Sequence, residues 1–334
     1  MKIWLPTIRA NSGADVFTMR LAEALHRVGH EPVVEWFDHR YEIKPWLLKK
    51  KPAPIGTDLI HAGSWQGFAF KRTGIPLVIT EHNYLKHPEF IEYRGVAQKI
   101  YHDFLISHYL KLSYDAADVL VSVSEHNAKA MRNDFSKQIE VIHNWVDTDE
   151  FYPKSEQLTN TGNRPFRLLY VGNPSRWKGS DLVTDFAEKL PLEIELLCLG
   201  GLRTKLKTTG QNIRQLPRHE PHEMPDLYRN VDAVVVLSRY ESFGYVALEA
   251  MASGVPVIGF DVSGTAEVCK GSDCAILVPD GDIDALVLAA VRLSKSNSLC
   301  QRLGANGRRA AINRFSGSKQ IQYYLDLYAR VCNQ

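Results

Sequence analysis

A short apolar run, a glycine-containing turn and an apolar helix follow one another between residues 233 and 252, and this stretch constrains the fold most. Residues 233–237 have the composition of a buried β-strand, and residues 245–252 that of a buried helix. A strand that leads through Gly244 into a helix presents backbone N–H groups and the positive end of the helix dipole to an anion. The stretch therefore predicts an α/β domain with an anion-binding turn.

Two carboxylates stand eight residues apart in this stretch. Glu241 falls in the turn, and Glu249 is the only charged residue of the apolar helix. A helix that is apolar on nearly every side is usually buried, and a buried carboxylate without partners is costly, so we expect Glu249 to have polar partners. The alternative for an isolated pair of this kind is a solvent-exposed Glu241 and a Glu249 held in a structural ion pair.

The length of 334 residues favours two domains, and the composition is that of an ordinary globular protein. A formal net charge of +2 is too small to indicate a nucleic-acid partner, and none is expected. The five cysteines have no metal-ligand spacing, which is typical of a reduced, cytoplasmic protein. Pro6 and Arg9 interrupt any signal peptide, and no apolar run approaches a membrane span, so we expect any membrane contact to be peripheral.

The first residues form a βαβ pattern of their own. Residues 2–7 and 32–37 have the composition of strands, and Gly13 lies in the turn before the helix that separates them. The turn has no GxGxxG sequence, which argues against a nicotinamide or flavin dinucleotide site. Further along, a strand at 76–80 runs directly into Glu81-His82, which places His82 at the edge where α/β proteins bind ligands.

A second α/β pattern begins at 166–171 and runs into Gly172-Asn-Pro-Ser-Arg-Trp-Lys-Gly179. Lys178, in a turn that follows a strand, is a candidate phosphate ligand, whereas without that context it is a surface lysine. Ser253-Gly-Val-Pro256 and Leu277-Val-Pro-Asp-Gly281 follow Glu241-x7-Glu249 in order. Taken together, these four motifs resemble glycosyltransferase family 4, the retaining enzymes of the GT-B fold.

The resemblance covers nearly the whole chain and is strongest over residues 167–315. It implies an α/β GT-B architecture, in which two Rossmann-like domains face a central cleft. Residues 1–153 would bind the acceptor, residues 154–315 would bind a nucleotide sugar, and a C-terminal helix at 316–334 would cross back to the first domain. Asn144-Trp-Val-Asp147 to Phe151 resembles the linker of the family, with Trp145 in place of a glycine, which explains Asp147-x-Asp149 better than a metal motif does.

The resemblance also implies roles for individual residues. The leaving diphosphate would be bound by Lys178, by Arg176 and by backbone near Gly13 and Gly172, with Asn173 standing where the family usually has an arginine. Glu249 would hold the ribose hydroxyls and Glu241 the sugar hydroxyls. His82, which stands in a Thr-x-His pattern, would line the opposite side of the sugar. The backbone N–H groups of the turn into the helix would complete the anion site, and these belong to Ser242, Phe243, Gly244, Tyr245 and Val246.

No metal and no cofactor is expected, because, as in the family, charge stabilised in this way needs no metal ion. The implied reaction moves a sugar from a UDP- or GDP-sugar, with retention, to a glycan or lipid-linked acceptor. Compact members of the family commonly act in the synthesis of bacterial surface polysaccharide or lipopolysaccharide, and the resemblance implies the same role for this chain. Two alternatives stay open: a sugar-nucleotide epimerase of similar shape, and a catalytically dead nucleotide-sugar-binding protein, which the departure at Asn173 favours.

Residues 40–54 interleave basic and aromatic side chains. Trp46 with Lys49, Lys50 and Lys51 is a combination that can bind an anionic membrane surface at the inner face of the plasma membrane. A solvated loop with the tryptophan packed on its own domain is the alternative. A third class of function, a peripheral membrane module, would place the activity of the whole chain in this segment.

Overall fold

The computed structural model describes residues 1–333 except 11, 155–163 and 201–209. The chain divides into two compact units, which we describe separately. Unit 1 holds residues 1–144 and 318–334, and unit 2 holds residues 145–317. The first division falls nine residues before the domain boundary expected at 153/154, and the second places nearly all of the terminal helix α12 (Gly317–Cys332) with unit 1.

Unit 1 is built on a six-stranded parallel sheet in the order β2-β1-β3-β4-β5-β6. Its middle strands are mostly apolar and almost entirely buried, because helices cover both faces of such a sheet. The strands are β1 (Lys2–Ile8), β2 (Glu31–Phe37), β3 (Leu59–Gly63), β4 (Leu77–Glu81), β5 (Val119–Ser122) and β6 (Ile139–Val141).

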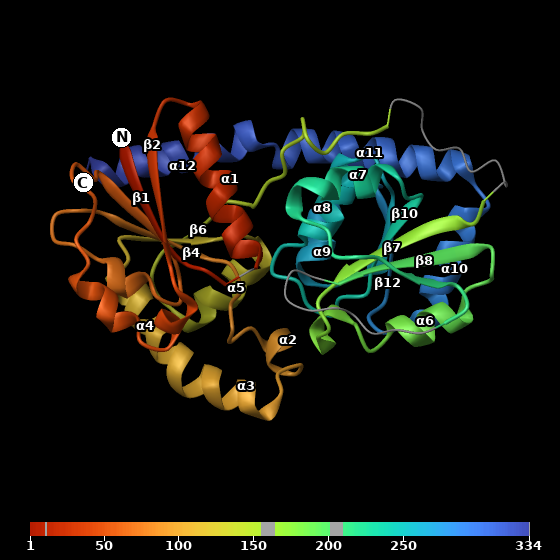
Figure 1. Cartoon of the computed structure of the whole chain (residues 1–334), viewed down its shortest axis with the longest axis horizontal. Helices are drawn as coiled ribbons and strands as arrows, with labels where there is room; N and C mark the ends of the chain where they lie inside the picture. Colours follow the sequence, from red (N-terminus) through yellow and green to blue (C-terminus); the bar gives the residue numbers. More distant parts are fainter. Residues whose placement is uncertain (11, 155–163, 201–209, 334) are drawn as a thin grey trace. The chain divides into compact units, whose positions relative to one another are not determined.

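Six α-helices belong to the described part of unit 1, and Figure 1 labels all of them. A π-helical segment, His102–Ile106, joins α3 to α4 without a break. Short 3₁₀ turns lie at His39–Glu42, Pro45–Lys50 and Gly67–Phe70. The helices are α1 (Gly13–Arg27), α2 (Pro88–Ile91), α3 (Val96–Tyr101), α4 (Ser107–Ala116), α5 (Glu125–Asp134) and α12.

Unit 2 contains a second six-stranded parallel sheet, in the order β12-β11-β10-β7-β8-β9. From β7 the chain first builds β8 and β9 on one side, and then returns to build β10, β11 and β12 on the other. The order therefore reverses between β7 and β10, and this is the point where open α/β sheets bind ligands. The strands are β7 (Phe166–Gly172), β8 (Ile194–Gly200), β9 (Ile213–Gln215), β10 (Ala233–Val236), β11 (Val257–Phe260) and β12 (Ala275–Val278).

Helices cover both faces of the second sheet (Figure 1). Apolar side chains of α6 and α10 pack on one face with residues of β7, β8 and β10, while α8 packs against α9 and α11 on the other. The strand–turn–helix unit predicted at 233–252 is confirmed, since β10 and α8 form there. The helices are α6 (Val183–Lys189), α7 (Met224–Arg229), α8 (Tyr245–Ala252), α9 (Ser263–Cys269), α10 (Ile283–Ser294) and α11 (Asn297–Phe315).

Candidate functional site

Lys178 and Glu241 meet at the carboxyl edge of the second sheet. The Nζ atom of Lys178 lies 2.6 Å from Oε1 and 2.8 Å from Oε2 of Glu241. The two residues follow β7 and β10, which pair directly, so the loops after them lie at the same edge at the reversal of strand order. Although both residues were candidates from the sequence, the contact between them was not predicted.

Glu241 is held through its carboxylate and through its backbone. The hydroxyl of Ser238 donates to the carboxylate oxygen Oε1 over 2.7 Å, and the backbone N–H of Glu241 donates to the hydroxyl of Ser263 over 2.7 Å. Only 9% of Glu241 is exposed, so the alternative in which it is a solvent-exposed residue is wrong. Buried charge of this kind is stable only with a partner, and Lys178, whose side chain is 26% exposed, supplies it.

The turn between Glu241 and α8 depends on Gly244, whose φ of +99° lies in the left-handed region. Gly244 is also the N-cap of α8, and among the described residues no side chain caps this helix. Phe243 is buried against Phe315, with ring centroids 5.8 Å apart, and this contact anchors the turn on the core of unit 2. The structure thus places Ser242, Tyr245 and Val246 around the amino end of a helix, where the dipole favours an anion.

Glu249 lies on α8 and is partly exposed rather than fully buried. Tyr228 is the last residue but one of α7, and its hydroxyl donates to Oε2 of Glu249 over 3.1 Å. The prediction that Glu249 has a polar partner is therefore confirmed. Tyr228 itself is completely buried, so it holds the carboxylate in one position.

The loop after β7 packs against the end of β10 at Gly179. The φ angle of Gly179 is +68°, and a Cβ atom added to this residue would lie 2.0 Å from the carbonyl oxygen of Leu237. The hydroxyl of Tyr170 donates to the carbonyl of Lys178 over 2.9 Å and fixes the loop from the strand side. Gly172, at the end of β7, is buried as the loop begins.

Asn173 and Arg176 flank the lysine in this loop. Arg176 is exposed, and its carbonyl accepts a hydrogen bond of 2.7 Å from the guanidinium of Arg239. Asn173 is partly buried, and among the described residues its Oδ1 atom has no hydrogen-bond partner. Arg239, which also pairs with Asp181 through bonds of 2.7 and 3.0 Å, was missed in the sequence, since no motif distinguishes it there.

Gly13 and His82, the remaining predicted ligands, belong to unit 1. Gly13 is exposed at the first position of α1. His82 follows β4 and packs edge-on against Phe17, with ring centroids 4.6 Å apart, and burial lowers its pKa to about 4. The imidazole is therefore neutral near pH 7 and can donate or accept a hydrogen bond but carries no charge.

A second histidine, His61, is buried close to His82 and was not predicted from the sequence. His61 on β3 is buried between the hydroxyls of Tyr328, 2.5 Å from Nδ1, and of Thr80, 2.7 Å from Nε2. Burial, together with the nearby His82, lowers the pKa of His61 to about 3. Because Tyr328 lies on α12, this contact also fastens the terminal helix to the first sheet.

In the basic and aromatic segment at residues 40–54, only some side chains are available to contact a membrane. Lys51 pairs with Glu35 at 2.7 Å, and Lys49 lies over the ring of Phe68 at 5.3 Å. The ring of Trp46 contacts that of Tyr109 in an edge-to-face arrangement, yet Trp46 stays 47% exposed. None of the described helices combines the length and the apolar composition needed to span a bilayer.

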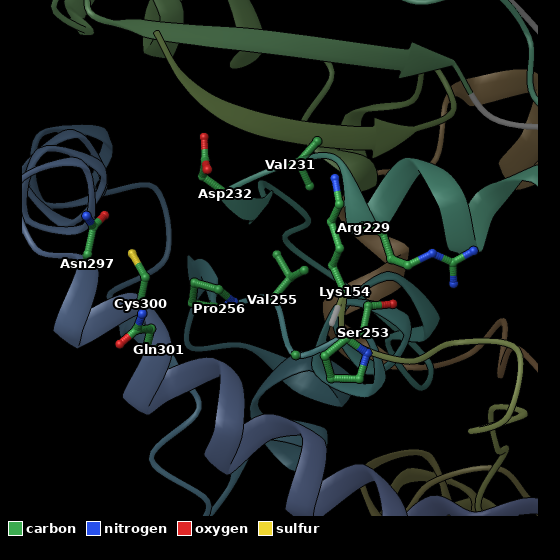
Figure 2. A pocket seen from close by; sticks show the side chains of 12 residues that line it. Lys154, Arg229, Val231, Asp232, Ser253, Val255, Pro256, Asn297, Cys300 and Gln301 are labelled. Atoms are coloured by element: carbon green, nitrogen blue, oxygen red, sulfur yellow. The ribbon is translucent and has the colours of Figure 1, made fainter. Parts of the chain in front are cut away.

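A small cavity lies at the opposite edge of the second sheet, where β10 and β11 begin (Figure 2). Its lining includes Val231, Asp232 and Pro256, and its volume is about 60 Å³. That is room for about two water molecules, far below the several hundred Å³ of small-molecule sites.

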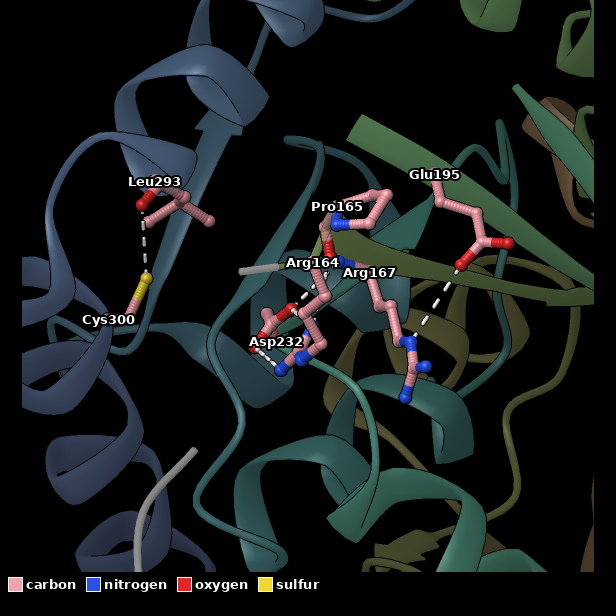
Figure 3. Close-up of polar contacts among 7 residues, drawn as sticks. All are labelled: Arg164, Pro165, Arg167, Glu195, Asp232, Leu293 and Cys300. Atoms are coloured by element: carbon pink, nitrogen blue, oxygen red, sulfur yellow. Dashed lines mark hydrogen bonds and ion pairs between the residues drawn. The ribbon is translucent and has the colours of Figure 1, made fainter. Parts of the chain in front are cut away.

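The polar groups beside this cavity are structural (Figure 3). The guanidinium of Arg164 binds both oxygens of Asp232, at 2.6 and 2.7 Å, and the backbone N–H of Arg167 donates to the same carboxylate. Cys300 donates to the carbonyl of Leu293 over 3.4 Å. The cavity is therefore part of the packing of unit 2 and is not the candidate site.

Two family models match different parts of the chain. A model described as Glycosyltransferase Family 4 matches residues 37–150, and one described as Glycosyl transferases group 1 matches residues 153–310. The second match contains the loop with Lys178 and the turn with Glu241. The chain belongs to glycosyltransferase family 4.

Relatives of this family 4 chain include D-inositol 3-phosphate glycosyltransferase of Xylanimonas cellulosilytica, which is 31% identical over 241 residues, or 64% of the chain and 57% of the relative. The chain spans between 57% and 66% of the length of the curated relatives that it matches first.

Solved structures agree on the fold. Sucrose-phosphate synthase from Thermosynechococcus elongatus has a TM-score of 0.82 at 20% identity, over 99% of this chain and 98% of that one. HepE from Anabaena, solved with UDP-glucose, has a TM-score of 0.77 at 17% identity, over 99% and 100%. The predicted α/β GT-B class, with two Rossmann-like units, is confirmed.

Proposed function

We propose that this family 4 chain is a retaining glycosyltransferase that moves a sugar from a UDP- or GDP-sugar to a glycan or lipid-linked acceptor. The observation that carries the proposal is the ion pair of Lys178 and Glu241 beside the amino end of α8. It combines a cation, a carboxylate and backbone N–H groups at the reversal of strand order in unit 2. These are the groups that a nucleotide diphosphate sugar requires.

In the proposed mechanism the diphosphate binds at the amino end of α8 and beside Lys178. Charge develops on the leaving diphosphate as the glycosidic bond breaks, and the ammonium of Lys178 with the N–H groups of residues 242–246 stabilises that charge. Exposed Arg176 lies two residues before Lys178 and supplies further positive charge. No metal ion is needed for this step.

The carboxylates have positioning roles in the proposal. Glu241 holds Lys178 in place and accepts hydrogen bonds from sugar hydroxyls, while Glu249, fixed by Tyr228, accepts them from the ribose. His82 of unit 1, neutral near pH 7, contacts the sugar or the acceptor, and Gly13 allows backbone to approach the diphosphate. Transfer proceeds with retention and without a covalent intermediate on the protein.

A surface of unit 1 supports the proposed lipid-linked acceptor and a cytoplasmic location at the membrane face. Tyr101 donates to Glu42 over 2.8 Å and Tyr109 donates to the carbonyl of Ile43 over 2.8 Å, so the segments 41–50 and 96–109 form one surface. We call it the apolar–basic surface. Its large apolar side chains are between 47% and 81% exposed, and they are Ile43, Trp46, Leu47, Val96, Ile100 and Phe104. Exposed apolar groups next to Lys49 and Lys50 suit an anionic bilayer interface.

The product is proposed to be a bacterial surface polysaccharide or lipopolysaccharide.

Thermal unfolding with UDP, GDP, ADP and their sugars tests the nucleotide site. UDP is the first ligand to try, because HepE was solved with UDP-glucose. A ligand at about 100 times its Kd stabilises by roughly 2.7 kcal/mol. We expect one base to raise Tm for the wild type and for the exposed control Glu188→Gln, and the rise to be lost in Glu249→Gln. No shift with any nucleotide would contradict the proposal. A shift without sugar transfer would favour the catalytically dead nucleotide-sugar-binding alternative, whereas conversion of the free donor sugar would indicate an epimerase.

A further inference from the structure

Two histidines and a glutamate converge in unit 1, outside the residues used above. Among the residues that the structure describes, His87, Glu89 and His126 each offer one ligand atom, and these atoms lie within 4.8 Å of one another. The Nε2 atom of His126 is 3.1 Å from Oε2 of Glu89. The two imidazole rings are stacked, with centroids 4.4 Å apart and planes inclined by 29°.

The topology of the first sheet brings these residues together. His87 is the N-cap of α2 and Glu89 lies in the first turn of that helix, in the loop after β4, while His126 is the second residue of α5, directly after β5. The strands β4 and β5 pair in parallel, so both segments lie at the same edge. The pairing of these two strands therefore brings the three residues together.

We propose that His87, Glu89 and His126 bind one divalent transition-metal ion. Two imidazole nitrogens and one carboxylate oxygen form a ligand set that suits Zn²⁺ and its neighbours, whereas Mg²⁺ and Ca²⁺ prefer oxygen ligands throughout. The separation of 3.1 Å between His126 and Glu89 is close to the roughly 3.3 Å edge of a tetrahedron with metal–ligand bonds of about 2.05 Å.

The burial of the three ligands gives the ion an entry path and an open position. His87 is 5% exposed, whereas the side chains of His126 and Glu89 are 25% and 47% exposed, so one side of the group faces solvent. A bound ion joins the loop after β4, which begins with His82, to the start of α5. The site thus fastens a segment of unit 1, whereas the ammonium and the helix end proposed to bind the diphosphate belong to unit 2.

Co²⁺ alone, added to the full chain without a polyhistidine tag, tests the site through its visible absorption bands. We expect one Co²⁺ per chain, displaced by one equivalent of Zn²⁺. Glu89→Gln is the first variant, because Glu89 is exposed and its replacement leaves the fold intact, and His126→Asn is the second. Loss of a ligand weakens metal affinity at least about tenfold.

His108→Asn is the matched control, since His108 is an exposed histidine of the same unit that stands outside the group. It should bind Co²⁺ like the wild type. Zn²⁺ should also raise Tm for the wild type and for His108→Asn, and raise it clearly less for the two ligand variants. Wild-type protein that binds no Co²⁺, or ligand variants that bind it as tightly as the wild type, would overturn the proposal. Neither measurement uses a nucleotide, so the result is independent of the glycosyltransferase proposal.

Discussion

The Nζ atom of Lys178 lies within 2.8 Å of both carboxylate oxygens of Glu241, and each residue follows one of two adjacent parallel strands. The pair therefore joins the loop after β7 to the turn before α8. A charged pair that is mostly buried stabilises the protein only while both partners are present, because either one alone leaves a charge poorly solvated. The same two groups are those we propose to contact the diphosphate and the sugar.

The coupling between these residues can be measured. We expect Lys178→Ala and Glu241→Gln each to lower the free energy of unfolding by about 1–3 kcal/mol, and the double variant to cost less than the sum. Urea unfolding of the four proteins gives the coupling directly. Additive losses would show that the two side chains do not interact. Both single variants should also lose nucleotide binding, whereas exposed Lys295→Ala should keep it.

Gly179 tests the contact of the loop with β10. Gly179→Ala places a Cβ atom at 2.0 Å from the carbonyl oxygen of Leu237 and adds left-handed strain. Gly271 has a similar φ of +70° but nothing within 4 Å of an added Cβ, so Gly271→Ala measures the strain alone. We expect about 1–2 kcal/mol for the control and a clearly larger loss for Gly179→Ala, in thermal or urea unfolding. Equal losses would mean that the loop moves away from Leu237 at no cost.

Tyr228→Phe removes the hydroxyl that donates to Glu249 and leaves the buried ring in place. The free energy of unfolding should fall by about 0.5–1.5 kcal/mol. Because the carboxylate loses its fixed position, nucleotide affinity measured by calorimetry should also fall. Tyr323→Phe, at a tyrosine that is 46% exposed, should change neither quantity. A Tyr228→Phe variant with unchanged affinity would show that Glu249 needs no such support.

His61 should make the stability of unit 1 depend on pH. Its pKa is lowered to about 3 in the folded protein against about 6.5 when unfolded, so the unfolded chain binds more protons below pH 6.5. The free energy of unfolding is therefore fully retained above pH 6.5 and falls as the pH drops toward 3. Between pH 7 and 5.5 the loss from this one residue is about 1 kcal/mol.

Urea unfolding at these two pH values checks the sign and the size of the effect. In His61→Gln the part of the pH dependence that belongs to this residue should disappear, whatever the variant does to stability at pH 7. The exposed His108→Gln should keep the dependence of the wild type. An unchanged pH dependence in His61→Gln would mean that His61 is protonated alike in both states.

Flotation with vesicles that contain anionic lipid tests the apolar–basic surface. Phe104, which is 81% exposed, contributes apolar contact, and Lys49 and Lys50 contribute charge. We expect Phe104→Ser to weaken binding at any salt concentration, and Lys49→Glu with Lys50→Glu to weaken it most at low salt. Lys295→Glu in unit 2 is the charge control. Binding that none of these changes affects would remove the membrane proposal.

Local patterns in the sequence determined much of the fold. Apolar runs and turn glycines predicted the strands at 2–7, 166–171 and 233–237 and the helix at 245–252, because burial and backbone freedom act over a few residues. The four ordered motifs indicated the family. The need of Glu249 for a polar partner also followed from its place in an apolar helix, although the identity of that partner did not.

Tertiary structure alone decided which of these groups touch. Lys178 and Glu241 are 63 residues apart and meet because β7 and β10 are neighbours where the strand order reverses. His61 meets Tyr328 across 267 residues because α12 packs on the first sheet, and His87 meets His126 because β4 pairs with β5. The order of strands depends on how whole helices and sheets bury apolar surface, a property that no local spacing of residues records.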